Sequence, residues 1–212
     1  MKDIIVIGAG FAGLWAALGA ARRLDELGLS SGEMTITMVN RDPWHSIRVR
    51  NYENDISDAR VPLTDLLDPV GIRLVLGDVT AIDNTARTVG VATETGNRTL
   101  SYDRLVIAAG SQQHLPDIAG LSAYGFFIDT WEQAKALERH LSVLPDQPAG
   151  SGRDTVLIIG AGLTGVELAC EMPNRLRGIR ITDARTILVD TQDHIGSNMG
   201  PEAVPVIVEA LS

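Results

Sequence analysis

The same glycine pattern occurs twice in this sequence, each time between a short apolar run and a stretch of helical character. The first copy is Gly8-Ala9-Gly10-Phe11-Ala12-Gly13, and the second, about 150 residues later, is Gly160-Ala161-Gly162-Leu163-Thr164-Gly165. Ile4–Ile7 precedes the first copy and Thr155–Ile159 the second, and both runs are typical of strands buried in a parallel sheet. A strand, a tight glycine turn and a helix begin a βαβ unit, so the chain is predicted to contain two such units.

The glycine spacing also indicates what these units bind. In a GxGxxG loop the first glycine makes the tight turn and the second lets the backbone approach a pyrophosphate. The third lets the helix pack close to the strand, and the helix N-terminus attracts the negative charge. One such motif is a weak signal, because glycine is common in ordinary turns. Two motifs in the same strand–loop–helix context predict two dinucleotide sites.

The residue that ends the second strand of each unit is expected to bind the adenosine ribose. In the second unit this residue is Asp190, after the strand Thr186–Val189. A carboxylate there accepts hydrogen bonds from ribose hydroxyls and repels a 2′-phosphate, which favours NADH over NADPH. In the first unit the matching residue is Asn40, after the strand Thr35–Val39. Asn40 can bind a ribose hydroxyl without a full charge, and the neighbouring Arg41 weakens any exclusion of a phosphate.

Further elements are predicted on either side of the second loop. The stretch Asp42–Leu67 is polar and is predicted to be irregular. Helices are predicted to begin at Leu14, at the capping box of Thr130–Gln133, after Gly165 and near Glu202. Five further strands are expected, the first four as an antiparallel excursion: Ile72–Leu76, Val79–Ile82, Thr88–Thr93, Arg98–Tyr102 and Leu105–Ala109. The predicted fold class is α/β, with two Rossmann-like units of three layers around parallel sheets, the second unit being incomplete.

Composition limits the classes of partner. The formal net charge of −9 argues against nucleic acid. The longest apolar stretch, Phe11–Ala21, is about half a membrane span, and glycines fit a signal peptide badly, so a cytoplasmic protein is expected. Cys170 is the only cysteine, which excludes an intrachain disulfide. The four histidines lack the spacing of metal ligands, so no metal site is expected: His45, His114, His140 and His194.

Three motifs in order carry a family resemblance. They are the first glycine loop, Leu105-Val106-Ile107-Ala108-Ala109-Gly110-Ser111, and the second glycine loop extended to Val166-Glu167. Together they resemble the pyridine nucleotide–disulfide oxidoreductase superfamily, and within it type II NADH dehydrogenases, over the whole chain. The resemblance implies FAD on the first loop and NADH on the second. It also implies that a hydride passes from NADH to FAD and then to a small-molecule acceptor such as a quinone.

The resemblance, with the ribose positions, specifies the expected contact residues. The FAD contacts are expected at Gly8, Gly10, Phe11, Ala12, Gly13, Asn40, Arg41, Val79, Ala109 and Gly110. The NADH contacts are expected at Gly160, Gly162, Leu163, Thr164, Gly165, Glu167 and Asp190. Glu167 is expected near the nicotinamide, although an acid on the first turn of a helix also has an explanation in the helix dipole. Trp44 and Tyr52 fall where the family places groups near the flavin ring. The alternative is that these two side chains only pack in the protein interior.

Two departures from the family are visible in the sequence. The disulfide-reducing members carry CxxxxC on the first long helix, and this chain has no cysteine there, so disulfide reduction is not expected. Residues 1–113 are expected to form the FAD domain and 114–212 an incomplete NADH domain, as in a truncated or split enzyme. A homodimer, a completing second polypeptide and peripheral membrane association of the complete enzyme follow as expectations. The alternatives are a nucleotide-binding fragment without turnover and an NADH-dependent reductase of a protein such as a ferredoxin.

Overall fold

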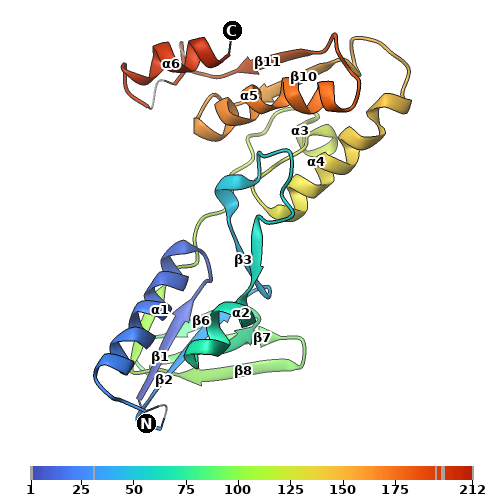
Figure 1. The fold of residues 1–212 in the computed structure, drawn as a ribbon. Helices are drawn as coiled ribbons and strands as arrows, with labels where there is room; N and C mark the ends of the chain where they lie inside the picture. Colours follow the sequence, from blue (N-terminus) through green and yellow to red (C-terminus); the bar gives the residue numbers. More distant parts are fainter. Residues whose placement is uncertain (1, 31, 194, 197–198, 212) are drawn as a thin grey trace. The chain divides into compact units, whose positions relative to one another are not determined.

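The structure is a computed structural model that describes residues 2–30, 32–193, 195–196 and 199–211. It divides into two compact units, coloured along the chain in Figure 1. The first unit comprises Met1–Ile47 and Asp58–Gln113, and the second comprises Arg48–Ser57 and His114–Ser212. One boundary between the two units follows Gln113. The short Arg48–Ser57 segment interrupts the first unit in the sequence and is part of the second.

A parallel sheet of four strands forms the centre of the first unit. Its order is β5-β2-β1-β9, with bounds β1 (Lys2–Ile7), β2 (Met34–Asn40), β5 (Arg73–Leu76) and β9 (Arg104–Ile107). All three neighbouring pairs run parallel. The predicted excursion is therefore one strand shorter than expected, because its first strand pairs with β2 instead. The last strand ends at Ile107, two residues earlier than predicted.

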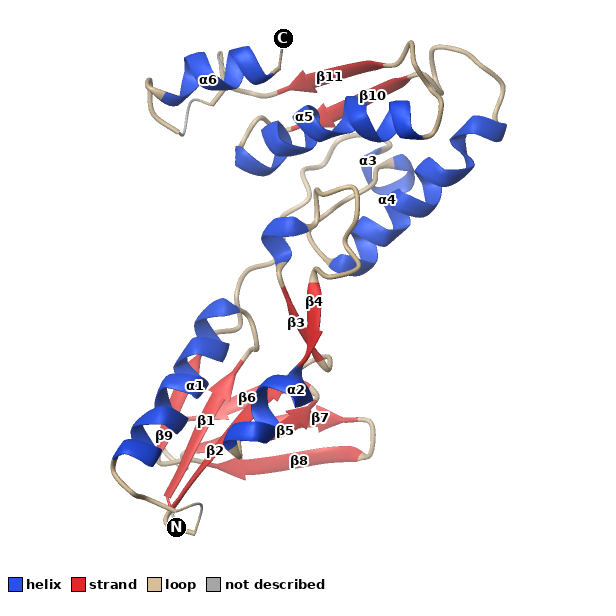
Figure 2. Ribbon diagram, in the orientation of Figure 1, coloured by secondary structure: helices blue, strands red, loops and turns tan. Residues whose placement is uncertain are grey.

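Both faces of this sheet are covered. The helices α1 (Phe11–Glu26) and α2 (Leu63–Leu67) lie on one side, where Val6 and Met38 of the sheet share a core with Leu14 and Leu63. On the other side the antiparallel sheet of β6 (Asp78–Asp83), β7 (Thr88–Thr93) and β8 (Gly96–Ser101) supplies the third layer. Successive strand residues point to opposite faces, so Ile5 and Ile7 join this second core while Val6 joins the first. Figure 2 shows α1 lying along the parallel strands.

The stretch predicted to be irregular contains short regular elements. β3 (Trp44–Ser46) and β4 (Arg60–Pro62) form an antiparallel ribbon, with His45 opposite Val61. The same stretch also contains the 3-10 turn η1 (Arg48–Arg50) and the helix α2, and the 3-10 turn η2 (Asp68–Val70) follows it directly. These elements are too short for a periodic sequence signal, which explains why the prediction missed them.

The second unit is built on two parallel strands, β10 (Thr155–Ile159) and β11 (Arg185–Val189). The helices are α3 (Leu121–Tyr124), α4 (Trp131–Val143), α5 (Leu163–Gly178) and α6 (Ala203–Ala210), with the turn η3 (Leu144–Asp146) after α4. The predicted capping box is confirmed, because the Thr130 hydroxyl accepts from the Gln133 amide and the Gln133 side chain accepts from the Thr130 amide. Leu137 and Leu141 of α4 pack against Met172 and Leu176 of α5. The described part of the chain thus confirms an α/β fold with two parallel-strand units.

The two-stranded sheet is covered on one side. Ile158 is buried and Val156 packs against the α4–α5 core. The alternate residues face the other way, so Leu157 and Ile159 are 55% and 48% exposed. Val189 of β11 is 40% exposed. In the first unit, by contrast, alternate residues of β1 are buried on both sides.

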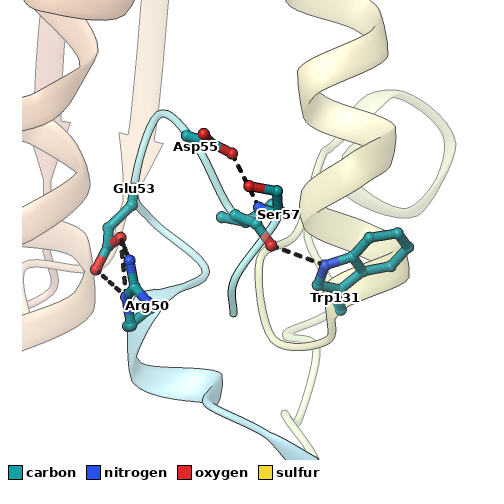
Figure 3. A network of polar contacts seen from close by, with 6 residues as sticks. Arg50, Glu53, Asp55, Ser57 and Trp131 are labelled. Carbon is teal, nitrogen blue, oxygen red and sulfur yellow. Dashed lines mark hydrogen bonds and ion pairs between the residues drawn. The ribbon is translucent and has the colours of Figure 1, made fainter. Parts of the chain in front are cut away.

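The Arg48–Ser57 segment is attached to the second unit by polar contacts. Asn51 donates to the carbonyl oxygens of Ile128 at 3.1 Å and Asp129 at 3.4 Å, and Arg48 pairs with Asp129. The Trp131 indole donates to the Ile56 carbonyl at 3.1 Å, at the start of α4 (Figure 3). Within the segment, Arg50 pairs with Glu53 at 2.7 Å. Ten residues inserted in the sequence of the first unit therefore complete the second.

Candidate functional site

The first glycine loop has the geometry that its sequence requires. Gly8 adopts a φ of +94°, in the region that favours glycine, and its amide donates to the Val39 carbonyl at 2.8 Å. A Cβ at Gly8 would lie 2.3 Å from the Ala108 carbonyl oxygen, and a Cβ at Gly13 would lie 1.8 Å from the Gly8 carbonyl oxygen. Both positions therefore exclude any larger residue, since backbone atoms occupy the space.

The middle glycine of this loop is different, because it faces open space. A Cβ at Gly10 would meet no described atom within 4 Å. Gly10 is the N-cap of α1, where no side chain caps the helix and no acidic residue lies in the first turn. The free N-terminal end of a helix beside an open backbone suits an anionic group. The loop therefore fits the pyrophosphate of a dinucleotide.

The second loop repeats this geometry closely. Gly160 has a φ of +103° and donates to the Val189 carbonyl at 2.8 Å. A Cβ at Gly165 would lie 1.8 Å from the Gly160 carbonyl oxygen, and a Cβ at Gly162 would meet nothing within 4 Å. Gly162 caps α5, again without a side-chain cap or an acid in the first turn. The second loop fits a pyrophosphate for the same reasons.

Asn40 and Asp190 occupy matching places and hold their loops in the same way. The Asn40 side-chain oxygen accepts from the Ala9 amide at 3.0 Å, and the Asp190 carboxylate accepts from the Ala161 amide at 2.5 Å. The other Asp190 oxygen accepts from the Gln192 amide at 2.9 Å. These backbone hydrogen bonds, the one from Ala161 first, lower the pKa of Asp190 below its usual value. Both residues thus anchor the loop as well as ending the strand that the sequence singled out.

Arg41 forms an ion pair with an acid of β6. The Arg41 guanidinium lies 2.7 Å from the carboxylate of Asp78. Asp78 is the first residue of β6 and immediately precedes Val79. Val79 itself packs against the core beneath the sheet. The structure therefore brings Asn40, Arg41 and Val79 to the same end of the first unit.

The Ala109–Gly110 stretch follows a strand end that contacts the first loop. The Ala108 amide donates to the Ile7 carbonyl at 2.8 Å. The Ala108 carbonyl lies so close to Gly8 that it leaves no room for a Cβ there. Ala109 Cα would lie 3.1 Å from a Cβ at Gly8, and Gly110 has a φ of +72°. The chain therefore turns at Gly110 directly after contacting the loop.

Glu167 is not on the first turn of its helix, contrary to the sequence-based expectation. α5 begins at Leu163, so Glu167 is its fifth residue and the first turn holds no acid. The helix-dipole explanation is therefore wrong for this residue. Glu167 is half-buried, and that burial raises its pKa.

Tyr52 lies near Glu167 within the second unit. Burial raises the pKa of Tyr52 first, and the charges of Glu167, Glu53 and Glu171 raise it further. The Tyr52 carbonyl accepts from Arg175 at 3.4 Å. Tyr52 therefore belongs to the second unit. Trp44 lies in β3 of the first unit, where the Arg60 Cζ lies 4.6 Å from the centroid of its ring.

Arg175 is a residue that the sequence did not reveal. Its side chain is buried, with the whole residue 7% exposed, and its Nε has no hydrogen-bond partner among the described atoms. Burial lowers the pKa of Arg175, while the charges of Glu138 and Glu171 act in the opposite direction. Glu167, Glu171 and Arg175 recur every four residues and so share one face of α5. The spacing is visible in the sequence, but nothing there shows that Tyr52 would cover this face.

The remaining sequence-based assignments concern metal and membrane. Within the described ranges, no three His, Cys, Asp or Glu side chains are grouped to hold a metal ion, and His194 lies outside those ranges. Cys170 is half-buried, and its thiol contacts the Ala210 carbonyl at 3.8 Å. No described helix is both long and apolar enough to cross a membrane.

Known proteins resemble this chain in sequence and in fold. An NADH dehydrogenase-like protein of Mycobacterium tuberculosis is 50% identical to it, over 100% of this chain and 53% of that protein. A type II NADH:quinone oxidoreductase of Staphylococcus haemolyticus is 30% identical over 82% of this chain and 44% of that protein. The chain thus spans about half the length of the curated relatives it matches.

A solved structure and a protein-family match point in the same direction. NDH2 of Plasmodium falciparum, solved in complex with NADH, shares it with a TM-score of 0.77 at 14% identity, over 98% of this chain and 45% of that one. The pyridine nucleotide-disulphide oxidoreductase family matches residues 2–212. With both glycine loops formed and the whole described chain covered by that match, this protein belongs to the pyridine nucleotide-disulphide oxidoreductase family.

Proposed function

We propose that this chain carries the FAD and NADH sites of an oxidoreductase of the NADH dehydrogenase type. The observation that carries the proposal is the duplicated cradle, in which Gly10 and Gly162 each face open space at an uncapped helix N-terminus. Two dinucleotide sites suit an enzyme that exchanges electrons between two dinucleotides. The names of the similar proteins, which are NADH dehydrogenase-like or NADH:quinone oxidoreductases, support the same activity.

FAD is assigned to residues 1–113 and NADH to residues 114–212. In the first unit the amides around Gly10 would hold the pyrophosphate, with Asn40 at the ribose and Val79 and Ala109–Gly110 beside the dinucleotide. In the second unit the amides around Gly162 would hold the pyrophosphate, and Asp190 would bind the ribose. When bound, the flavin and the nicotinamide supply the redox chemistry itself, and the protein supplies orientation and electrostatics.

Glu167 is proposed to lie at the nicotinamide, where its half-buried carboxyl can hold a proton or accept a hydrogen bond. Tyr52 is proposed to lie near the nicotinamide as well. Its carbonyl accepts from Arg175 of α5, and the charge of Glu167 raises its pKa. In Glu167→Gln the KM for NADH should change, while FAD content stays at the wild-type level. An unchanged KM would contradict this assignment.

Asp190 supports a preference for NADH over NADPH. Its carboxylate is exposed at the end of β11, where a 2′-phosphate would meet a like charge. Asp190→Ser combined with Thr191→Arg should shift the preference toward NADPH. Equal affinity of the wild type for both nucleotides, measured by titration, would remove Asp190 from this role.

The acceptor is proposed to be a quinone, at a membrane surface that the complete enzyme would touch from the cytoplasmic side. The name of the Staphylococcus relative supports this acceptor. NADH oxidation with a soluble quinone and with ferredoxin as alternative acceptors would separate the two reductase functions. Faster turnover with ferredoxin would contradict the quinone proposal.

A binding function without turnover is the second candidate, because the two glycine loops fit pyrophosphates and nucleotide binding alone would use both of them. One experiment separates the candidates. The purified chain is incubated with FAD and desalted, its absorbance spectrum is recorded, and NADH is added without oxygen. Bleaching of the flavin absorbance supports the oxidoreductase, and bound flavin that does not bleach supports the binding function. A colourless protein after incubation with FAD contradicts both assignments to the first loop.

A further inference from the structure

We propose that His45 is a positioning residue for the first dinucleotide loop, holding the peptide group between Ala9 and Gly10 so that the Gly10 amide faces the pyrophosphate. The inference rests on the proposed function in one respect, namely that the first loop binds FAD. No role for His45 follows from the glycine motif, since the histidine comes 35 residues after Gly10 in the sequence.

The geometry joins His45 directly to the loop. His45 is the middle residue of β3, is 6% exposed, and its Nδ1 lies 2.7 Å from the Ala9 carbonyl oxygen. A carbonyl oxygen can only accept, so Nδ1 must carry the hydrogen and donate it. The pairing of β3 with β4, in which His45 lies opposite Val61, holds the histidine backbone in place. The donor is therefore supplied by a regular element rather than by a free loop.

A second contact fixes the plane of the imidazole. The His45 ring meets the Phe11 ring edge to face, with centroids 5.2 Å apart and planes at 89°. Such edge-to-face pairs are favourable because the positive ring edge meets the negative ring face. Phe11 is the first residue of α1. One histidine therefore contacts the loop before Gly10 and the helix after it.

Planarity of the peptide bond transmits the hydrogen bond to the cradle. The Ala9 carbonyl and the Gly10 amide belong to one planar group, and in a trans peptide they point in opposite directions. The structure has no cis peptide bond among its described residues. When His45 holds the Ala9 carbonyl on its own side, the Gly10 amide must point to the opposite side. Gly10 is the residue with open space beside it and the N-cap of α1.

The peptide group before Ala9 is held separately. The Ala9 amide donates to the Asn40 side chain at 3.0 Å, and Asn40 in turn donates to the Asp42 carbonyl at 2.8 Å. Asn40 and His45 therefore grip the two sides of Ala9, one through its amide and the other through its carbonyl. The loop reaches the cofactor already in its binding conformation, which lowers the entropy that binding must otherwise remove.

The experiment compares His45→Leu with His45→Asn in the full chain. Leucine fills a similar volume without a donor, whereas the asparagine side-chain amide can take the place of Nδ1 and donate to Ala9. We expect His45→Leu to weaken FAD binding about tenfold, the size of one lost hydrogen bond, and His45→Asn to restore most of it. The dissociation constant is measured by FAD titration well below the unfolding temperature. His140→Leu, in the second unit, is the matched control and should bind FAD as the wild type does.

The carbonyl carbon chemical shift of Ala9 supplies a readout that needs no cofactor, because that carbonyl is the group His45 binds. The shift should differ from the wild type in His45→Leu and return to it in His45→Asn. If His45→Leu does not fold, His45→Ala removes the same donor and replaces it in both measurements. Wild-type affinity and carbonyl shift in the donor-free variant, or equal changes in the asparagine and leucine variants, would overturn the inference. Failure of the wild type to bind FAD would instead overturn the proposed function, while the carbonyl shift still decides the role of His45.

Discussion

The two glycine loops of this protein are nearly identical in backbone, yet they are embedded in very different surroundings. In each loop the first glycine has a positive φ, the third touches the carbonyl of the first, and the middle one faces open space. The first loop, however, rises from a four-stranded sheet covered on both faces, and the second from a two-stranded sheet covered on one. A binding loop of this kind thus depends on its own strand and helix far more than on the size of the sheet.

The anchors of the loops differ in one atom and in charge. Asn40 and Asp190 accept from the equivalent loop amides, but only Asp190 is ionised. The loops also differ in how the rest of the unit is completed. The first unit closes with its own antiparallel sheet, whereas the second recruits Arg48–Ser57 from the sequence of the first. These contrasts suggest four experiments.

The largest effect is expected from the third glycines. In Gly13→Val and Gly165→Val the new Cβ would collide with a backbone carbonyl at 1.8 Å, so the helix must move off its strand. Each change should destabilise its own unit by about 3 kcal/mol, the upper end of overpacking costs. Hydrogen exchange resolved along the chain measures both units at once. If Gly13→Val loosened residues 114–212 as much as the first unit, the two loops would not be independent.

The middle glycines should affect binding without affecting the fold. Gly10 and Gly162 have ordinary backbone angles and open space, so valine fits the protein but fills the place of a pyrophosphate. Gly10→Val should weaken FAD binding by about 100-fold and Gly162→Val should do the same for NADH, which corresponds to about 2.7 kcal/mol. Thermal unfolding should stay near that of the wild type. Loss of both ligands from either variant would mean that the assignment of one cofactor to each loop is wrong.

A smaller loss of stability is expected when the contacts of the Arg48–Ser57 segment with the second unit are removed. Asn51→Leu removes two hydrogen bonds to the carbonyls of Ile128 and Asp129, although it also removes a buried side-chain oxygen that lacks a partner among the described atoms. We expect a net loss of about 1.5 kcal/mol. The loss should appear in the hydrogen exchange of residues 114–193 rather than in the first unit. The neighbouring Asn54 is exposed, so Asn54→Leu serves as the control. Faster exchange confined to β1 and β2 would contradict the division into units.

The smallest effect concerns acid stability and separates the two anchors. The pKa of Asp190 is lowered in the folded protein, so its stabilising contribution is present above its ordinary value near 3.8 and is lost as the pH falls through the lower folded value. Asp190→Asn should therefore flatten the acid limb of the melting temperature of the second unit. Asn40→Asp should add such a limb to the first unit. A melting temperature with the same pH dependence in wild type and Asp190→Asn would show that the loop does not rely on this charge.

Much of the fold was predictable because its signals are local. The strands β1, β2, β10 and β11, the helix α5 and the capping box at Thr130 were each predicted within a few residues, and the glycine loops have the expected form. Backbone conformation at Gly8 or Gly160 depends on the residue itself and its close neighbours. Apolar periodicity likewise depends on a few adjacent residues, so it can be read without knowing the rest of the chain.

Contacts between distant segments were decided only by the tertiary structure. The sequence by itself determined the two βαβ units, the form of their glycine loops and the places of Asn40 and Asp190 at the strand ends, because these follow from local conformation and strand order. It did not determine that the side chains of Asn40 and Asp190 accept hydrogen bonds from the loop amides. Nor did it determine that β5 joins the parallel sheet, that His45 reaches Ala9, or that Tyr52 covers the face of α5 that carries Arg175. Each of these last three contacts joins residues more than 30 positions apart. Which distant partners meet depends on the competition among all possible packings of the chain, and a local pattern carries no information about that competition.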